Sequence, residues 1–63
     1  MANKIGNKLR KLRGKKTQEK VAEDLGISVS AVASYELGKR MPRDPLKVEI
    51  AKYYGTTVQD LFF

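Results

Sequence analysis

Apolar side chains recur at helical intervals on both sides of Gly26, in the most regular pattern of the chain. Before the glycine they fall at Val21, Ala22 and Leu25, and after it at Ile27, Val32 and Tyr35. Intervals of three and four residues place side chains on one face of a helix. The pattern therefore predicts two short helices within residues 17–36, each with one buried face, and an inward-facing isoleucine in the turn between them.

The residues that flank these two helices are suited to begin and end them. Thr17 and Ser28 are each expected to cap a helix N-terminus, because a hydroxyl accepts a hydrogen bond from a backbone N–H of the first turn. Gly26 is expected to end the first helix, since glycine enters the left-handed region without a Cβ clash. A connection this short requires the helices to cross steeply, which is the helix-turn-helix arrangement.

One more helix is predicted before this pair and two after it. The first covers about residues 3–13 and carries an apolar stripe formed by Ile5, Leu9 and Leu12. A later helix is expected to begin with Asp44 as N-cap and Pro45 as its first residue, and to stop at Gly55. Its predicted inward residues are Val48 and Ala51, with Leu46, Ile50 or Tyr54 beside them.

A last short helix is predicted over residues 58–62, with Thr57 as its cap. The C-terminal residues Leu61, Phe62 and Phe63 offer more apolar surface than so short a helix needs to bury, which is consistent with a subunit interface or with a further domain after them. Five short helices without any strand pattern predict an all-α fold. At 63 residues, we expect the chain 1–63 to form a single domain.

The charge of the chain is strongly asymmetric. Thirteen basic residues face seven acidic ones, for a net charge of +6, and no acidic residue precedes Glu19. Such a field attracts polyanions, of which nucleic acid is the obvious candidate. Taken alone, however, the charge is equally well explained by solubility.

Several classes of function lack the residues that they need. The chain has no cysteine and no histidine, and no paired carboxylates or phosphate-binding glycine loop, so we predict neither an enzyme, nor a metal site, nor a cofactor. No apolar run approaches the ~20 residues of a membrane span, and a cytoplasmic protein is expected. The basic first helix would need a broad apolar face with aromatic residues to lie on a membrane, and it carries only three aliphatic residues.

Three segments resemble, in order and spacing, the phage-repressor and Cro-like helix-turn-helix proteins of the XRE family of transcriptional regulators. They are TQEKVAEDLGIS, VSAVASYELGKRMP and IAKYYGTTVQDLF, and the resemblance extends from Ile5 to Phe62. It implies a five-helix lambda-repressor-like fold and a sequence-specific transcriptional regulator, either a repressor or a Cro-like protein. It also implies a homodimer that binds a near-palindromic operator in double-stranded DNA. An antitoxin-type module that binds DNA and a protein partner is the alternative.

The recognition helix is expected at about residues 28–36, with its N-terminal part in the major groove. Helical projection leaves five residues outward or at the margin: Ser28, Val29, Ser30, Ala33 and Ser34. The resemblance matches all of these except Ser28 to base contacts. Val29 or Ala33 can pack against a thymine methyl, whereas serine hydroxyls read sequence loosely. Because this face offers no Arg, Gln or Asn, we expect specificity to depend on methyl contacts, water-mediated contacts and DNA shape. Taken alone, the same face is also consistent with a merely solvated helix surface.

Phosphate contacts are expected on both sides of this helix. Thr17 and Gln18 open the preceding helix, where backbone N–H groups and the helix dipole favour an anion. The resemblance assigns Gln18 a second role in bracing the recognition helix, and it matches Lys39, Arg40 and Arg43 to a loop that contacts the DNA backbone.

Arg13 and Glu36 match an ion pair of the family, with two solvated charges as the alternative. The connector between the first two helices is shorter than is usual there. Within it, Lys16 stands where an apolar residue is common.

Overall fold

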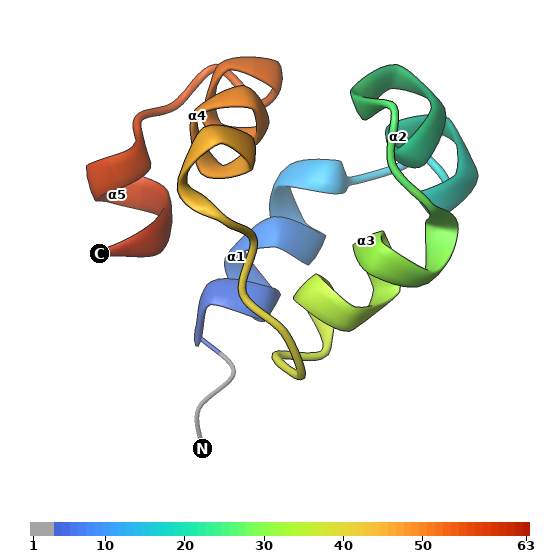
Figure 1. The fold of residues 1–63 in the computed structure, drawn as a ribbon, viewed down its shortest axis with the longest axis horizontal. Helices are drawn as coiled ribbons and strands as arrows, with labels where there is room; N and C mark the ends of the chain where they lie inside the picture. Colours follow the sequence, from blue (N-terminus) through green and yellow to red (C-terminus); the bar gives the residue numbers. More distant parts are fainter. Residues whose placement is uncertain (1–3) are drawn as a thin grey trace.

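The computed structural model describes residues 4–63 and contains five helices joined by short loops (Figure 1). They are α1 (Lys4–Arg13), α2 (Gln18–Leu25), α3 (Val29–Glu36), α4 (Asp44–Tyr53) and α5 (Val58–Phe62). The predicted all-α, five-helix architecture is confirmed. The predicted start of the first helix at Asn3 lies outside the described residues. Of the helices in residues 4–63, none combines the length and the apolar character that crossing a bilayer would require.

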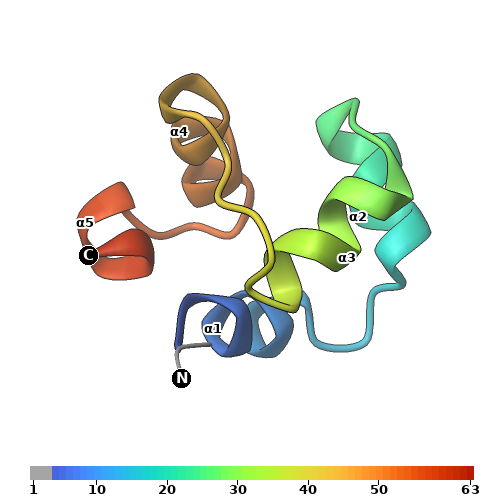
Figure 2. The same cartoon turned by 60° about the horizontal axis from the view of Figure 1, so that its bottom comes forward.

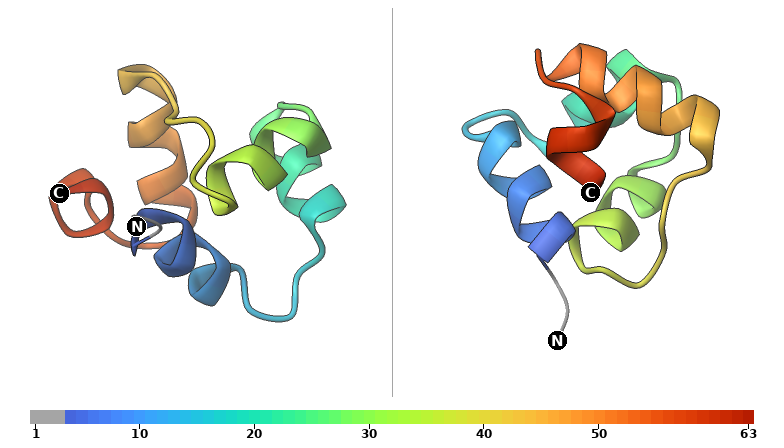
Figure 3. Two further views of the ribbon diagram at one scale, coloured as in Figure 1. Left: turned by 90° about the horizontal axis from the view of Figure 1, so that it is seen from below. Right: turned by 90° about the vertical axis from the view of Figure 1, so that its left-hand side faces the viewer.

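The helices form two groups on either side of α1. In Figures 1 and 2, α2 and α3 lie on one side of the molecule and α4 and α5 on the other. α1 packs against α3 and α5, and α2 packs against α3 and α4. The steep crossing of α2 and α3 is the predicted helix-turn-helix. Figure 3 shows the α1–α2 connector as an open loop that leads from α1 to the start of α2.

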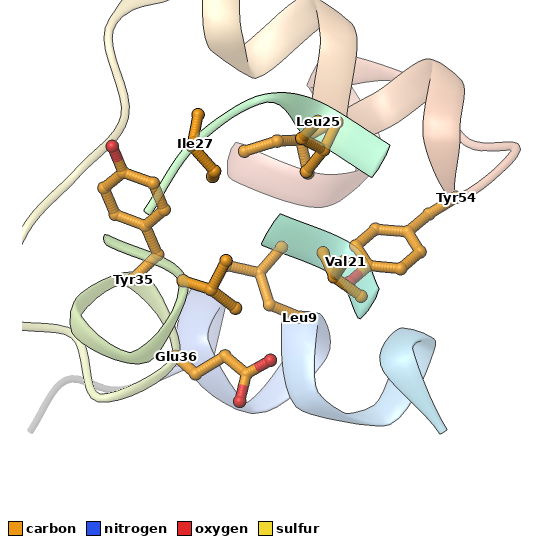
Figure 4. Close-up of a pocket in the computed structure, with 9 residues that line it drawn as sticks. Leu9, Val21, Leu25, Ile27, Tyr35, Glu36 and Tyr54 are labelled. Carbon is orange, nitrogen blue, oxygen red and sulfur yellow. The ribbon is translucent and has the colours of Figure 1, made fainter. Parts of the chain in front are cut away.

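Two clusters of buried side chains make up the core. One contains Leu9, Ala31, Tyr35, Ile50, Ala51, Leu61 and Phe62, and the other contains Val21, Ala22 and Val32. Ile27, in the turn between α2 and α3, packs against both clusters, so the predicted inward turn is confirmed. A small cavity of about 20 Å³ remains between the clusters, where Leu9 lies between Tyr35 and Tyr54 (Figure 4). Such a cavity has room for about one water molecule.

Local capping begins three of the helices as the sequence predicts. The hydroxyl oxygens of Thr17, Ser28 and Thr57 accept hydrogen bonds from backbone N–H groups in the first turns of α2, α3 and α5, each at 3.0 Å. Gly26 ends α2 in the left-handed conformation, with φ of 71°. These contacts satisfy N–H groups that otherwise have no partner within the helix.

The predicted N-cap of α4 is wrong by one residue. Arg43 has the extended backbone of a cap, and its carbonyl oxygen accepts the first helical hydrogen bond from the N–H of Lys47 at 2.9 Å. Asp44 is therefore already the first helical residue, and its side chain makes no cap. Its carboxylate is still favourable there, because the N-terminal end of a helix carries partial positive charge.

Two apolar residues predicted to face inward do not. Val48 and Leu12 are each 42% exposed. In α4 the buried row contains Ile50 with the partly buried Leu46 and Tyr54 four residues away on either side, and Val48 lies on the opposite face. In α1 the buried residues are Gly6 and Leu9, so the inward face is centred away from Leu12, which lies at the margin near α5.

Candidate nucleic-acid interface

The five residues predicted to contact bases lie on the outward face of α3 and at its N-cap. Ser28, Ser30 and Val29 are exposed, and Ala33 and Ser34 are half-buried. On the inner face Ala31, Val32, Tyr35 and Glu36 are buried. The helix therefore presents one face to solvent, most fully at its first turn, and packs against the core with the opposite face.

Ser28 differs from the other four because its hydroxyl has a structural role. Its Oγ accepts a hydrogen bond from the backbone N–H of Ala31 at 3.0 Å, which fixes the first turn of α3. The hydroxyl hydrogen is still able to donate outward. The cap therefore fixes the orientation in which the Ser28 hydroxyl faces solvent.

A buried carboxylate fixes the C-terminal end of α3. Glu36 is 3% exposed, and its Oε2 accepts from Nε of Arg13 at 2.6 Å. Its Oε1 accepts from Nη2 of Arg13 and from Nε2 of Gln18, both at 3.0 Å. We call these three residues the Glu36 cluster. It joins α1, α2 and α3, so the ion pair and the bracing role of Gln18 implied by the resemblance are both present.

The charges of the Glu36 cluster also affect ionisation nearby. The hydrogen bond to Glu36 raises the pKa of Arg13 above its usual value. Burial, with the charge of Glu36 as the second cause, raises the pKa of Tyr54 to about 12. Figure 4 shows Glu36 and Tyr54 among the residues that line the central cavity. The carboxylate thus acts within the interior of the protein, away from the outward face of α3.

The loop of residues 37–43 carries the predicted cationic phosphate contacts next to the end of α3. Lys39, Arg40 and Arg43 are all exposed. Among residues 4–63, none of these three is within ion-pair distance of an acidic side chain. The guanidinium of Arg40 lies 5.7 Å from the centre of the Tyr35 ring, an arrangement that orients it by a cation–π contact. The loop therefore presents cationic groups that are available to an anion.

The other predicted phosphate-binding residues begin α2. Thr17 is exposed, and Gln18 is half-buried with its amide engaged by Glu36. The predicted phosphate contacts therefore lie on two separate elements next to α3, the N-terminal turn of α2 and the loop after α3.

Within the described chain, no group of three or more acidic side chains is placed to bind a metal ion.

A helix-turn-helix family model matches residues 7–61 of the chain, which is most of its length. The chain belongs to the XRE-like helix-turn-helix family. It is also 39% identical, over 46 residues, to an HTH-type transcriptional regulator of Methanocaldococcus jannaschii. That alignment covers 73% of this chain and 70% of the relative. Both findings confirm the family that the three sequence segments resemble.

The connector of this helix-turn-helix protein contains interactions that the sequence did not reveal. Nζ of Lys16 donates to the hydroxyl of Tyr53 at 3.2 Å and lies 4.6 Å from the centre of its ring. The same hydroxyl donates to Oδ2 of Asp24 at 2.6 Å, and Lys20 lies 3.2 Å from Oδ1. We call these four residues the Asp24 cluster. It joins the connector and α2 to α4 through polar contacts.

Only part of the Asp24 cluster had a signal in the sequence. Lys20 and Asp24 are four residues apart on one helix, which is the spacing of a local ion pair. Tyr53 is 29 residues further along the chain, and nothing in the local pattern points to it. The hydrogen bond from Tyr53, followed by the contact with Lys20, lowers the pKa of Asp24 below its usual value.

Proposed function

We propose that this protein is a sequence-specific, double-stranded DNA-binding regulator of transcription, of the repressor or Cro-like type. The observation that carries the proposal is the exposed face at the start of α3, on a helix-turn-helix in which the Glu36 cluster fixes the C-terminal end of that helix. Membership of the XRE-like family and the description of the relative as an HTH-type transcriptional regulator support it. They favour it over the antitoxin-type alternative.

In the proposed complex, α3 enters the major groove with its N-terminal turns against the base edges. Ser28, Val29, Ser30, Ala33 and Ser34 contact the bases. These side chains are short, so the helix backbone can approach the groove closely. Hydroxyls, methyl groups and bridging water then distinguish the base pairs.

Phosphate contacts come from the elements on either side of α3. The first turn of α2 contributes Thr17, Gln18 and free backbone N–H groups, and the loop after α3 contributes Lys39, Arg40 and Arg43. The net charge of +6 increases the rate of encounter with DNA. Each cation that replaces a counterion adds about 0.9 to the slope of log affinity against log salt.

One copy of the protein covers only half of a near-palindromic operator, so we propose a homodimer on DNA. Half-sites then lie about 34 Å apart, one turn of B-DNA. Phe63 at the end of α5 is 78% exposed, and Met41 in the loop before α4 is 51% exposed. These apolar side chains support a dimer face formed by α5 and that loop.

Selection of binding sites from random duplex DNA tests this proposal, with Ser30→Ala and Lys39→Ala run in parallel. Ser30→Ala is expected to change the base preference at one position. Lys39→Ala is expected to lower affinity for every sequence alike and to reduce the salt slope by about 0.9. Lys52→Ala, which removes an exposed lysine at the far end of α4, is the charge-matched control and should keep the slope. Absence of any complex at low salt would refute the proposal, and identical behaviour of the two test variants would refute the division of roles.

A further inference from the structure

The part of α3 that faces solvent is uncharged. Among its eight residues, the only ionisable side chains are those of Tyr35 and Glu36, and both are buried. Val29, the first residue of the helix, is 39% exposed, whereas the other branched aliphatic residue, Val32, is buried. What α3 offers to a base edge at this point is therefore hydrocarbon.

The neighbours of Val29 on this face do not supply a base-specific pattern of hydrogen bonds. Ser30 and Ser34 carry hydroxyls, which both donate and accept. A hydroxyl can accept from the amino group of cytosine and can donate to the O4 oxygen of thymine, so it accepts either pyrimidine. The remaining difference between these bases in the major groove is the C5-methyl group, which thymine has and cytosine lacks.

Val29 is well suited to detect that methyl group because its own position is fixed. Ser28 caps the turn in which Val29 lies, through its 3.0 Å hydrogen bond to Ala31. A β-branched side chain in a helix has one strongly preferred rotamer. Its two methyl groups thus point in a set direction before DNA binds, and burying a further methyl against them requires no rearrangement.

We propose that Val29 is a specificity-determining residue that recognises the 5-methyl group of a pyrimidine. The protein then binds thymine and 5-methylcytosine alike at this position and discriminates against uracil and unmethylated cytosine. The inference rests on the proposed function, because it requires α3 in the major groove. It adds that cytosine methylation of a site changes binding in the same direction as substitution by thymine.

Two matched pairs of duplexes test the inference on a site obtained by selection. At each pyrimidine position in turn, thymine is compared with uracil opposite adenine, and 5-methylcytosine with cytosine opposite guanine. Within each pair only the methyl group differs. Burial of one methyl group changes affinity about fourfold. We expect this loss for uracil, and a gain of the same size for 5-methylcytosine over cytosine, at one position in each half-site.

Protein variants then identify the side chain responsible. Val29→Ala is expected to reduce the methyl effect at that position to less than twofold and to leave the other positions unchanged. Val48→Ala is the matched control, because Val48 is a similarly exposed valine, 42% against 39%, on the helix away from α3. It should retain the full effect. Thermal unfolding of both variants checks that neither substitution disturbs the fold.

The outcomes separate this inference from the function on which it rests. If no duplex binds at low salt, the proposed function fails and the inference fails with it. If selected DNA binds but no methyl group changes affinity by twofold or more, the proposed function is supported and the inference about Val29 is refuted. The inference is also refuted if Val29→Ala keeps the methyl effect unchanged.

Discussion

The Glu36 cluster and the Asp24 cluster both link helices through a carboxylate, but they differ in exposure to water. In each, a carboxylate is contacted by side chains from two helices. Arg13 and Gln18 donate hydrogen bonds to Glu36, whereas Tyr53 donates to Asp24 and Lys20 forms an ion pair with it. The side chain of Glu36 is 3% exposed, whereas that of Asp24 is 26% exposed. The comparison teaches that similar contacts have different energetic consequences when water can replace them.

Water cannot compensate for the loss of one partner in the Glu36 cluster. Removing Arg13 leaves the charge of Glu36, which is 3% exposed, with little solvation, and this costs far more than the intact pair contributes. In the Asp24 cluster, water takes the place of a lost partner, and surface ion pairs contribute little. We therefore expect the Glu36 cluster to contribute strongly to the placement of α3 and the Asp24 cluster to contribute only weakly to the placement of the connector.

The largest expected effect is that of Arg13→Ala. It leaves the carboxylate of Glu36, which is 3% exposed, without its charged partner and should lower the free energy of unfolding by about 3–5 kcal/mol. A chain of this size has a stability of roughly that order, so urea denaturation followed by circular dichroism should show a largely unfolded variant. The double substitution Arg13→Met with Glu36→Leu removes both charges and should recover much of the loss. A loss below about 1 kcal/mol in the single variant, the range of a surface pair, would contradict the buried role.

Gln18→Ala should have an intermediate effect. It removes one neutral donor to Glu36 but leaves the ion pair with Arg13 intact, and Gln18 is half-buried, so water replaces part of the contact. We expect a loss of about 1 kcal/mol, measured by urea denaturation. Gln59→Ala, at an exposed position of α5, is the matched control and should be nearly neutral. Equal losses in the two variants would show that the bond to Glu36 contributes nothing.

Tyr53→Phe should have a smaller effect. It keeps the ring that lies under Lys16 but removes the hydroxyl that contacts both Lys16 and Asp24. Because these contacts are at the surface, the thermal midpoint should fall by no more than a few degrees. A loss as large as that of Arg13→Ala would show that the two clusters are equivalent, contrary to the comparison.

The smallest effect should be the acid dependence of the Asp24 cluster. The lowered pKa of Asp24 means that the folded state favours its charged form. This contribution is present above the unfolded pKa of about 3.9 and is lost as the pH falls through the lower pKa of the folded state. Thermal midpoints of the parent protein and Asp24→Asn should differ slightly at neutral pH and converge in acid. A difference that grows toward low pH would have the wrong sign.

Much of this fold follows from contacts within a few residues. Thr17, Ser28 and Thr57 each bond to an N–H three residues ahead, and Gly26 ends its helix through its own conformational freedom. Such signals lie within short segments, so the sequence alone predicts the helices and their order. The outward placement of Val29 and Ser30 was predictable for the same reason, because the buried face of α3 follows from helical spacing.

Tertiary structure decided which surface each helix turns to its neighbours. The buried face of α1, which contains Gly6 and Leu9, leaves Leu12 at the margin, and the buried row through Ile50 leaves Val48 in solvent. The tertiary structure also places the hydroxyl of Tyr53 next to Asp24, 29 residues away in the sequence. Helical periodicity specifies an apolar stripe but not its exact orientation, since that depends on the shape of surfaces supplied by distant parts of the chain.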